Sequence, residues 1–170
     1  MTATNTITNT ATETSTITEQ TTIFTATSAV IAIPTFTVYA IGGPNNGNPM
    51  SNANGNIVRN TRVTSPPPVL QFTTVDINKL QVLNGPYAGS IGKTDPNASG
   101  SGAALYFGST RAGLVDTACQ VTYKSDGTCP LSCQAARGST SFDCGAIWRI
   151  GSDADVANCN RFVPYAVGAA

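Results

Sequence analysis

The sequence predicts an all-β protein, a two-sheet β-sandwich preceded by an extended threonine-rich arm. No window shows the 3.6-residue period of an amphipathic helix. From Ile33 onward, short runs of β-branched and aromatic residues alternate with clusters of Gly, Pro and Asn, the pattern of strands and turns. Threonine occupies every even position from Thr2 to Thr18, a period of two that belongs to extended chain. A β-trefoil-like fold is the alternative, since Gln71-Phe72-Thr73 and Gln120-Val121-Thr122 each precede a turn and a leucine-containing strand.

Residues 1–33 form the arm or stalk, and residues 34–170 form the β domain. At about 3.3 Å per residue, the alternating segment would span roughly 55 Å, too long for a strand within one small domain. One hypothesis is an O-glycosylated stalk. The other is a donor strand over residues 5–30 that pairs with a neighbouring copy, with Ile7, Ile17 and Ile23 pointing inward. That contact would be head-to-tail and would generate filaments.

The β domain reads as eight short strands. They are expected at residues 34–40, 69–75, 79–83, 103–107, 119–123, 129–133, 146–150 and 161–167. Two hairpins are predicted, one turning at Asp76-Ile77-Asn78 and one at Ser125-Asp126-Gly127, where Asp-Gly is a favoured turn dipeptide. Residues 42–55 are expected to be a loop that contributes almost nothing to the core. Trp148 lies in an apolar strand and is expected to be buried.

The cysteines predict disulfides. There are five: Cys119, Cys129, Cys133, Cys144 and Cys159. Paired C-x2-C spacing and histidine are both missing, which argues against zinc. Four of the five are therefore expected to form two disulfides and one to stay unpaired. Cys119 and Cys129 flank the second hairpin and are expected to face each other across it, which leaves Cys133 to pair with Cys144 or Cys159.

The composition indicates a secreted protein. Only 11% of the residues are charged, and nine basic side chains balance nine acidic ones, so no net field exists to hold nucleic acid or an anionic membrane. No run reaches the roughly 18 apolar residues of a membrane span. Because no signal peptide is visible, we expect a processed portion of a longer precursor. Asn97-Ala98-Ser99 is the one N-glycosylation sequon, in a loop where a glycan would fit.

The same sequence argues against catalysis. The absence of histidine removes the Ser-His-Asp and Cys-His mechanisms. Both glutamates lie in the arm, and a carboxylate pair for glycoside hydrolysis would have to come from Asp116, Asp143, Asp153 and Asp155, which form no motif. Residues 151–155 with Asn158 place oxygen ligands at alternate positions, as calcium loops do, but a polar turn is the preferred interpretation. We expect neither enzymatic activity nor a cofactor.

Residues 34–168 resemble a family of secreted fungal proteins of unassigned function, which join a β domain to Thr/Ser-rich stretches. The residues that carry the likeness are Phe36-Thr37-Val38-Tyr39-Ala40, Leu80-Gln81-Val82 with Tyr87, Leu105-Tyr106-Phe107, Cys129-Pro130-Leu131-Ser132-Cys133, Phe142-Asp143-Cys144-Gly145, and Cys159 with residues 163–167. The resemblance implies a fungal cell-surface or secreted origin and supplies no activity.

Two functions are therefore expected to compete. The first is a structural protein of the cell surface, cell wall or matrix, a self-assembling fibre subunit whose arm completes the sheet of the next copy. The alternative is a carbohydrate-binding module or adhesin on a glycosylated stalk. A donor strand needs apolar side chains directed at an acceptor, whereas a sugar site needs exposed aromatic residues near a concave surface.

Overall fold

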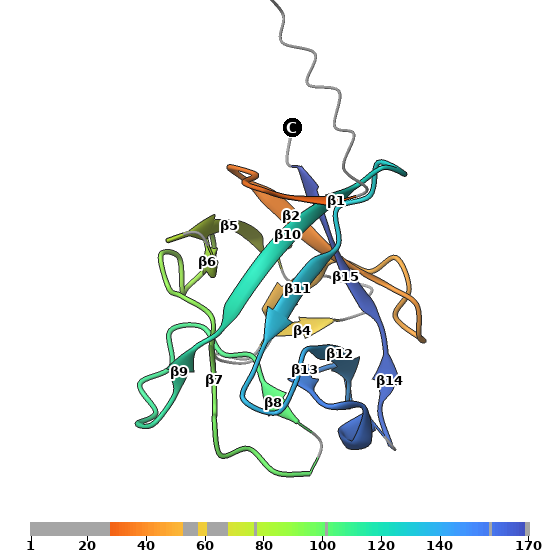
Figure 1. Ribbon diagram of the computed structural model, residues 1–170. Coiled ribbons are helices and arrows are strands. Elements are labelled where there is room, and N and C mark those ends of the chain that lie inside the picture. Colours follow the sequence, from red (N-terminus) through yellow and green to blue (C-terminus); the bar gives the residue numbers. More distant parts are fainter. Residues whose placement is uncertain are drawn as a thin grey trace, which may run out of the picture.

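The protein is all-β, as the sequence predicts. The computed structural model describes residues 28–52, 58–60, 68–76, 78–100, 102–156 and 158–168, and contains antiparallel sheets with a single 3₁₀ helix, η1 (Asp153–Val156) (Figure 1). Its strands are β1 (Ser28–Ile31), β2 (Phe36–Ile41), β3 (Met50–Asn52), β4 (Val58–Asn60), β5 (Gln71–Val75), β6 (Lys79–Val82), β7 (Lys93–Thr94), β8 (Ala103–Ala104), β9 (Val115–Asp116), β10 (Ala118–Lys124), β11 (Leu131–Gln134), β12 (Thr140–Asp143), β13 (Trp148–Gly151), β14 (Asn160–Arg161) and β15 (Val163–Gly168).

The larger sheet has seven strands and curls on itself. Its order is β1-β10-β6-β5-β2-β15. Strand β11 also pairs with β10, along the edge that β1 and β6 leave free. The N–H of Ala166 in β15 donates to the carbonyl of Cys129 at 2.8 Å, just before β11, and Pro130 bridges to Tyr165. These contacts join the two ends of the curled sheet. Strand β15 is therefore hydrogen-bonded along both of its edges.

The second sheet has four strands, in the order β14-β12-β13-β8, and lies at the lower right of the molecule in Figure 1. Two small sheets, β3-β4 and β7-β9, complete the fold. The two larger sheets enclose one core, in which Phe36 and Phe72 of the curled sheet and Trp148 of the second sheet are fully buried. Trp148 also donates its indole N–H to Ser141 Oγ at 3.1 Å, so its polar group is satisfied.

Alternation of side chains produces this core. In β2, residues Phe36, Val38 and Ala40 are fully buried, and the residues between them face outward. Both predicted hairpins are confirmed, β5–β6 and β10–β11. The predicted loop at residues 42–55 is wrong in part, because Met50 begins β3 and is fully buried in the core.

The end of the threonine-rich arm forms a strand of the β domain. Residues 5–27, with Ile7, Ile17 and Ile23, lie outside the described residues. Ser28–Ile31 form β1 and pair with Lys124–Val121 of the same chain. The end of the expected donor strand thus pairs with its own domain along one edge. Pairing of the arm with another copy stays a prediction.

Candidate functional site

The face of the curled sheet over β2 and β15 carries a concave apolar surface, which we call the tyrosine groove. It has a volume of about 440 Å³ and is lined by Tyr39, Ile41, Gly47, Thr128, Tyr165 and Val167. The groove arises from strand alternation, since these β2 and β15 residues point away from the core. Tyr39 and Tyr165 lie directly opposite each other in the β2–β15 register. Their rings come from neighbouring strands, which are about 4.8 Å apart in such a sheet.

The backbone beneath the tyrosine groove is already paired. Strand β15 pairs with β2 from Val163 to Gly168 along one edge and meets Cys129 and Pro130 along the other. Pro164 supplies no N–H, but its direct partner Ala40 donates its N–H to Asn48 instead, at 3.0 Å. Because no strand edge is free here, a ligand in the groove would be held by side chains rather than by strand addition.

A second concavity, the adjoining hollow, meets the tyrosine groove at Ile41. It has a volume of about 500 Å³ and lies between the curled sheet and the second sheet; its hydroxyl-bearing and charged lining residues are Ser132, Ser139, Thr140, Ser141 and Arg161. Among the described lining residues of both concavities, Arg161 alone is charged, and it forms a 3.1 Å ion pair with Asp153. The combined surface therefore offers aromatic rings and hydroxyl groups with little net charge, which suits an uncharged ligand.

The four aspartates considered for catalysis have structural partners. Asp116 contacts Lys79 at 3.1 Å, and this carboxylate raises the pKa of Lys79. Asp153 accepts a hydrogen bond from Thr140 Oγ1 at 2.7 Å as well as pairing with Arg161. Asp143 is buried and accepts a hydrogen bond from Asn45 Nδ2. These contacts hold loops and strands together.

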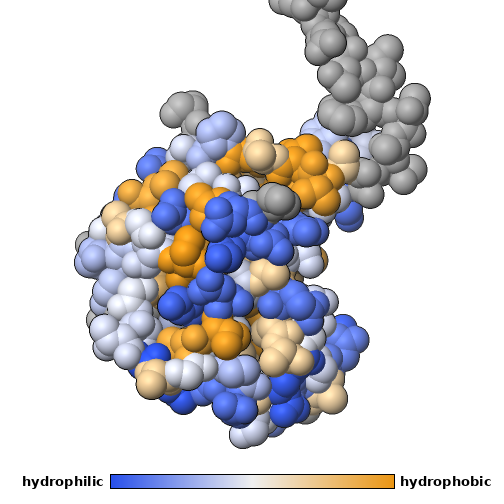
Figure 2. Space-filling model, turned by 60° about the vertical axis from the view of Figure 1, so that its left-hand side comes forward, coloured by the Kyte–Doolittle hydropathy of each residue, from blue (hydrophilic) through white to orange (hydrophobic). Residues whose placement is uncertain are grey.

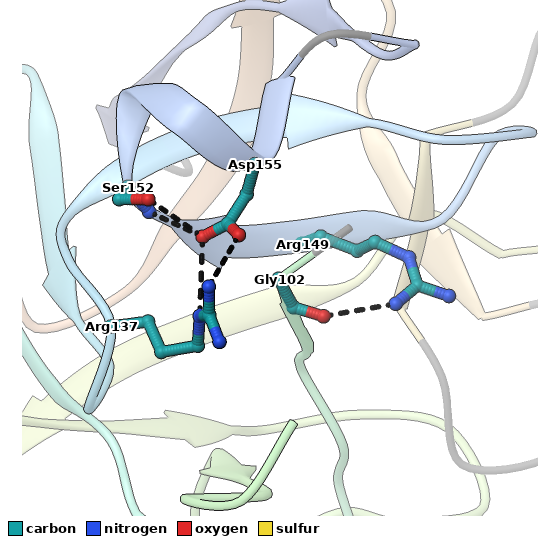
Figure 3. A network of polar contacts seen from close by, with 5 residues as sticks. All are labelled: Gly102, Arg137, Arg149, Ser152 and Asp155. Atoms are coloured by element: carbon teal, nitrogen blue, oxygen red, sulfur yellow. Dashed lines mark hydrogen bonds and ion pairs between the residues drawn. The ribbon is translucent and has the colours of Figure 1, made fainter. Parts of the chain in front are cut away.

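Asp155 anchors η1 to the neighbouring hairpin (Figure 3). Its carboxylate accepts hydrogen bonds from the backbone N–H and the hydroxyl of Ser152, both at 2.9 Å, and pairs with Arg137 at 2.9 Å. These bonds, the backbone N–H of Ser152 foremost, lower the pKa of Asp155. In the segment of residues 151–155, for which a calcium loop was weighed against a polar turn, the aspartates therefore pair with arginines. No group of three metal-ligating side chains occurs among the described residues.

Two disulfides form, as predicted, but the predicted pairing is wrong. Cys119 bonds to Cys133, and Cys144 bonds to Cys159, which leaves Cys129 as the free thiol. The reason is the hairpin register: Cys119 and Cys133 are direct partners in β10–β11, with Cα atoms 4.0 Å apart. The two bonds indicate an oxidising, extracellular environment.

The glycosylation sequon lies in a suitable place. Asn97 is exposed in a turn, where its backbone N–H donates to Asp95 Oδ1 at 2.9 Å. Arg111 holds the same aspartate at 2.5 Å, so the turn is fixed from two sides. This position is on the surface and accessible to a modifying enzyme, and occupancy by a glycan stays a prediction.

Sequence reasoning missed the tyrosine groove. The sequence assigns no role to Tyr39 or Tyr165. The available signal was their parity: Tyr39 has the opposite parity to Phe36 and Val38, and therefore points away from the core. Nothing in the sequence indicated that β2 and β15, more than 120 residues apart, are neighbours.

Comparisons with protein-family models, with curated proteins and with solved structures found no significant match. The resemblance to secreted fungal proteins therefore stays a prediction. Among the residues that the structure describes, no helix is long and apolar enough to cross a membrane.

Proposed function

We propose that the protein is an extracellular carbohydrate-binding module, with the tyrosine groove and the adjoining hollow as its binding surface. The observation that carries this proposal is the direct cross-strand pairing of Tyr39 and Tyr165 on an exposed, concave face. Tyrosine combines an apolar ring face, which can stack on the C–H groups of a sugar, with a hydroxyl that can form hydrogen bonds. Cavities of this size are typical of ligand sites.

The charge of the surface supports a neutral ligand. The chain has no net charge, and the arginine of the adjoining hollow is already paired with Asp153. An acidic polysaccharide would need unpaired cations, which the lining of these two concavities does not supply. The two concavities share Ile41, and their volumes of about 500 and 440 Å³ together offer room for more than one sugar unit. A neutral, extended cell-wall or matrix polysaccharide is therefore the ligand class that we propose.

The fibre subunit expected from the sequence has less support at this surface. Donor-strand addition requires unpaired backbone N–H and C=O groups at a sheet edge. Strand β15 has both edges occupied, so the groove cannot accept a strand in that way. Secretion, attachment to a fungal cell wall and display on a glycosylated stalk belong to the proposed function. The two disulfides support only its extracellular part.

Polysaccharide pull-down tests the proposal. The full chain is incubated with insoluble cellulose, chitin and β-1,3-glucan, with starch granules as a polymer of different shape, and the bound fraction is measured. We expect retention on at least one extended polymer and a clear loss for Tyr165→Ala. Tyr123→Ala is the matched control, since Tyr123 is also an exposed tyrosine but lies on β10, outside both concavities. Equal retention of the two variants would contradict the proposal.

A further inference from the structure

Strand β1 is an edge strand of the curled sheet among the residues that the structure describes. It pairs with β10 over Ser28–Ile31, and no other strand pairs with it in the part of the chain that the structure describes. Figure 1 shows β1 crossing the upper end of the molecule, where it forms the rim of the curled sheet. An exposed edge of this kind can pair with a strand of another chain.

The register identifies which backbone groups are free to do so. In β10, Thr122 and Lys124 donate their N–H groups to Pro130 and Thr128, at 3.0 and 2.9 Å, and so face the β11 side. Their direct partners in β1 are Val30 and Ser28. In an antiparallel pair, residues opposite such positions direct their own N–H and C=O groups away from the shared ladder. The backbone groups of Ser28 and Val30 therefore point to the open side of β1.

The residues of β1 include neither a charged residue nor a proline that would oppose pairing with another strand. The strand reads Ser-Ala-Val-Ile, and the Val30 side chain is 59% exposed. Two other edges carry charge: β14 has Arg161, and the β7–β9 pair has Lys93 and Asp116. The remaining edge strand of the second sheet, β8, is uncharged but buried. Figure 2 shows that the largest apolar area on its face of the molecule lies at the upper end, the end at which β1 lies in Figure 1.

We propose that β1 pairs antiparallel with β1 of a second copy, about a twofold axis at Val30. The occupant is a second copy because an uncharged strand is complementary to itself, and a twofold contact uses the same residues on both sides. The absence of net charge removes long-range repulsion between copies. Pro34 has no N–H and ends the run of possible donors, which limits the register. The contact is closed, and so differs from the head-to-tail contact expected for the arm.

Sedimentation equilibrium of the full chain tests this dimer. All samples carry Cys129→Ser, so that a disulfide between copies cannot contribute. We expect a monomer–dimer equilibrium whose dissociation constant rises on the order of tenfold or more in Val30→Lys, because a charge at the centre of the pairing must be desolvated. Val115→Lys is the matched control, since Val115 is an exposed valine on β9, and should leave the equilibrium unchanged.

A second variant separates pairing from folding. Val30→Pro removes one outward N–H and no donor to β10, so it should weaken the dimer while the far-UV circular dichroism and the thermal midpoint of the monomer change little. Hydrogen exchange should show that residues 28–33 become protected as the protein concentration rises. A wild-type chain that stays monomeric at high micromolar concentration, or that associates equally well with lysine at position 30, would overturn the proposal.

Discussion

The tyrosine groove exposes side chains, whereas the β1 edge exposes backbone groups. In the groove, β15 has its backbone paired on both edges, and what faces solvent is a set of side chains that includes two tyrosines. At β1, the side chains are uncharged, and no described strand pairs with the outer backbone edge. The first arrangement can distinguish ligands by shape and chemistry, whereas the second can add a strand with little regard to sequence. The two regions are therefore expected to bind different partners and to be separable by mutation.

The largest effect on stability is expected from removing the Cys119–Cys133 disulfide, which joins the strands next to both regions. Strand β10 pairs with β1 on one edge and with β11 on the other, and the Cys119–Cys133 bond joins it to β11. Replacing both cysteines by serine should lower the free energy of unfolding by about 3 kcal/mol, measured by chemical denaturation, because a covalent loop is opened. Sugar binding and dimerisation should weaken together.

Cys129→Ser is the control for that experiment. The Cys129 thiol is free and only partly buried, so its loss should change stability by less than about 1 kcal/mol. Similar losses for the double variant and for this control would mean that the Cys119–Cys133 bond does not stabilise the support of the two regions.

Removing the groove tyrosines should give the next largest effect, confined to one region. The double variant Tyr39→Ala with Tyr165→Ala should weaken binding of a soluble oligosaccharide on the order of 100-fold by calorimetry, about tenfold for each ring. Tyr165→Phe keeps the ring and should lose less. The monomer–dimer equilibrium should not move, and a variant that altered both activities to the same degree would remove the distinction between the two regions.

Acid should affect neither partner surface directly but should weaken the contacts that hold η1 to Arg137. The pKa of Asp155 is lowered in the folded chain, so its carboxylate adds stability above the unfolded value of about 3.9, and this contribution is lost as the pH falls through the lower folded value. Thermal midpoints measured between about pH 6 and pH 2 should therefore fall more steeply for the wild type than for Asp155→Asn. Parallel curves would show that the contacts to Ser152 and Arg137 are not formed in solution.

The smallest effect on the two regions is expected from deleting residues 1–26, which keeps β1 intact. Folding, oligosaccharide affinity and the β1 dimer should be unchanged, because the described contacts of β1 and the described lining of the groove come from Ser28 onward. Filaments seen by electron microscopy for the full chain and absent for the shortened one would support the donor-strand hypothesis for the arm. Loss of folding on deletion would show that the arm belongs to the domain.

Local sequence patterns predicted the strands and hairpins of this fold. Pairings between segments that are far apart in the sequence could not be predicted from such patterns. Side-chain alternation and the Asp126-Gly127 turn were sufficient for the β10–β11 hairpin. The position of this turn also sets the strand register, and the register determines the disulfide. Cys119 and Cys133 are equally far from Asp126 and therefore lie opposite each other, whereas Cys129 falls opposite Tyr123. The groove depends on β2 meeting β15 from the other end of the chain, and no local pattern encodes such a pairing. The burial of Met50 was missed for the same reason, because its partners are also distant in sequence.

The most direct test of the proposed binding surface is an NMR titration of the full, isotope-labelled chain with a soluble oligosaccharide of the polymer retained in pull-down. We expect chemical-shift changes along β2 and β15 that are centred on Tyr39 and Tyr165 and extend to Arg161 in the adjoining hollow. The signals of residues 28–31 should stay unchanged. Saturable changes centred on β1 or on the β7–β9 pair, with the groove residues unmoved, would contradict it.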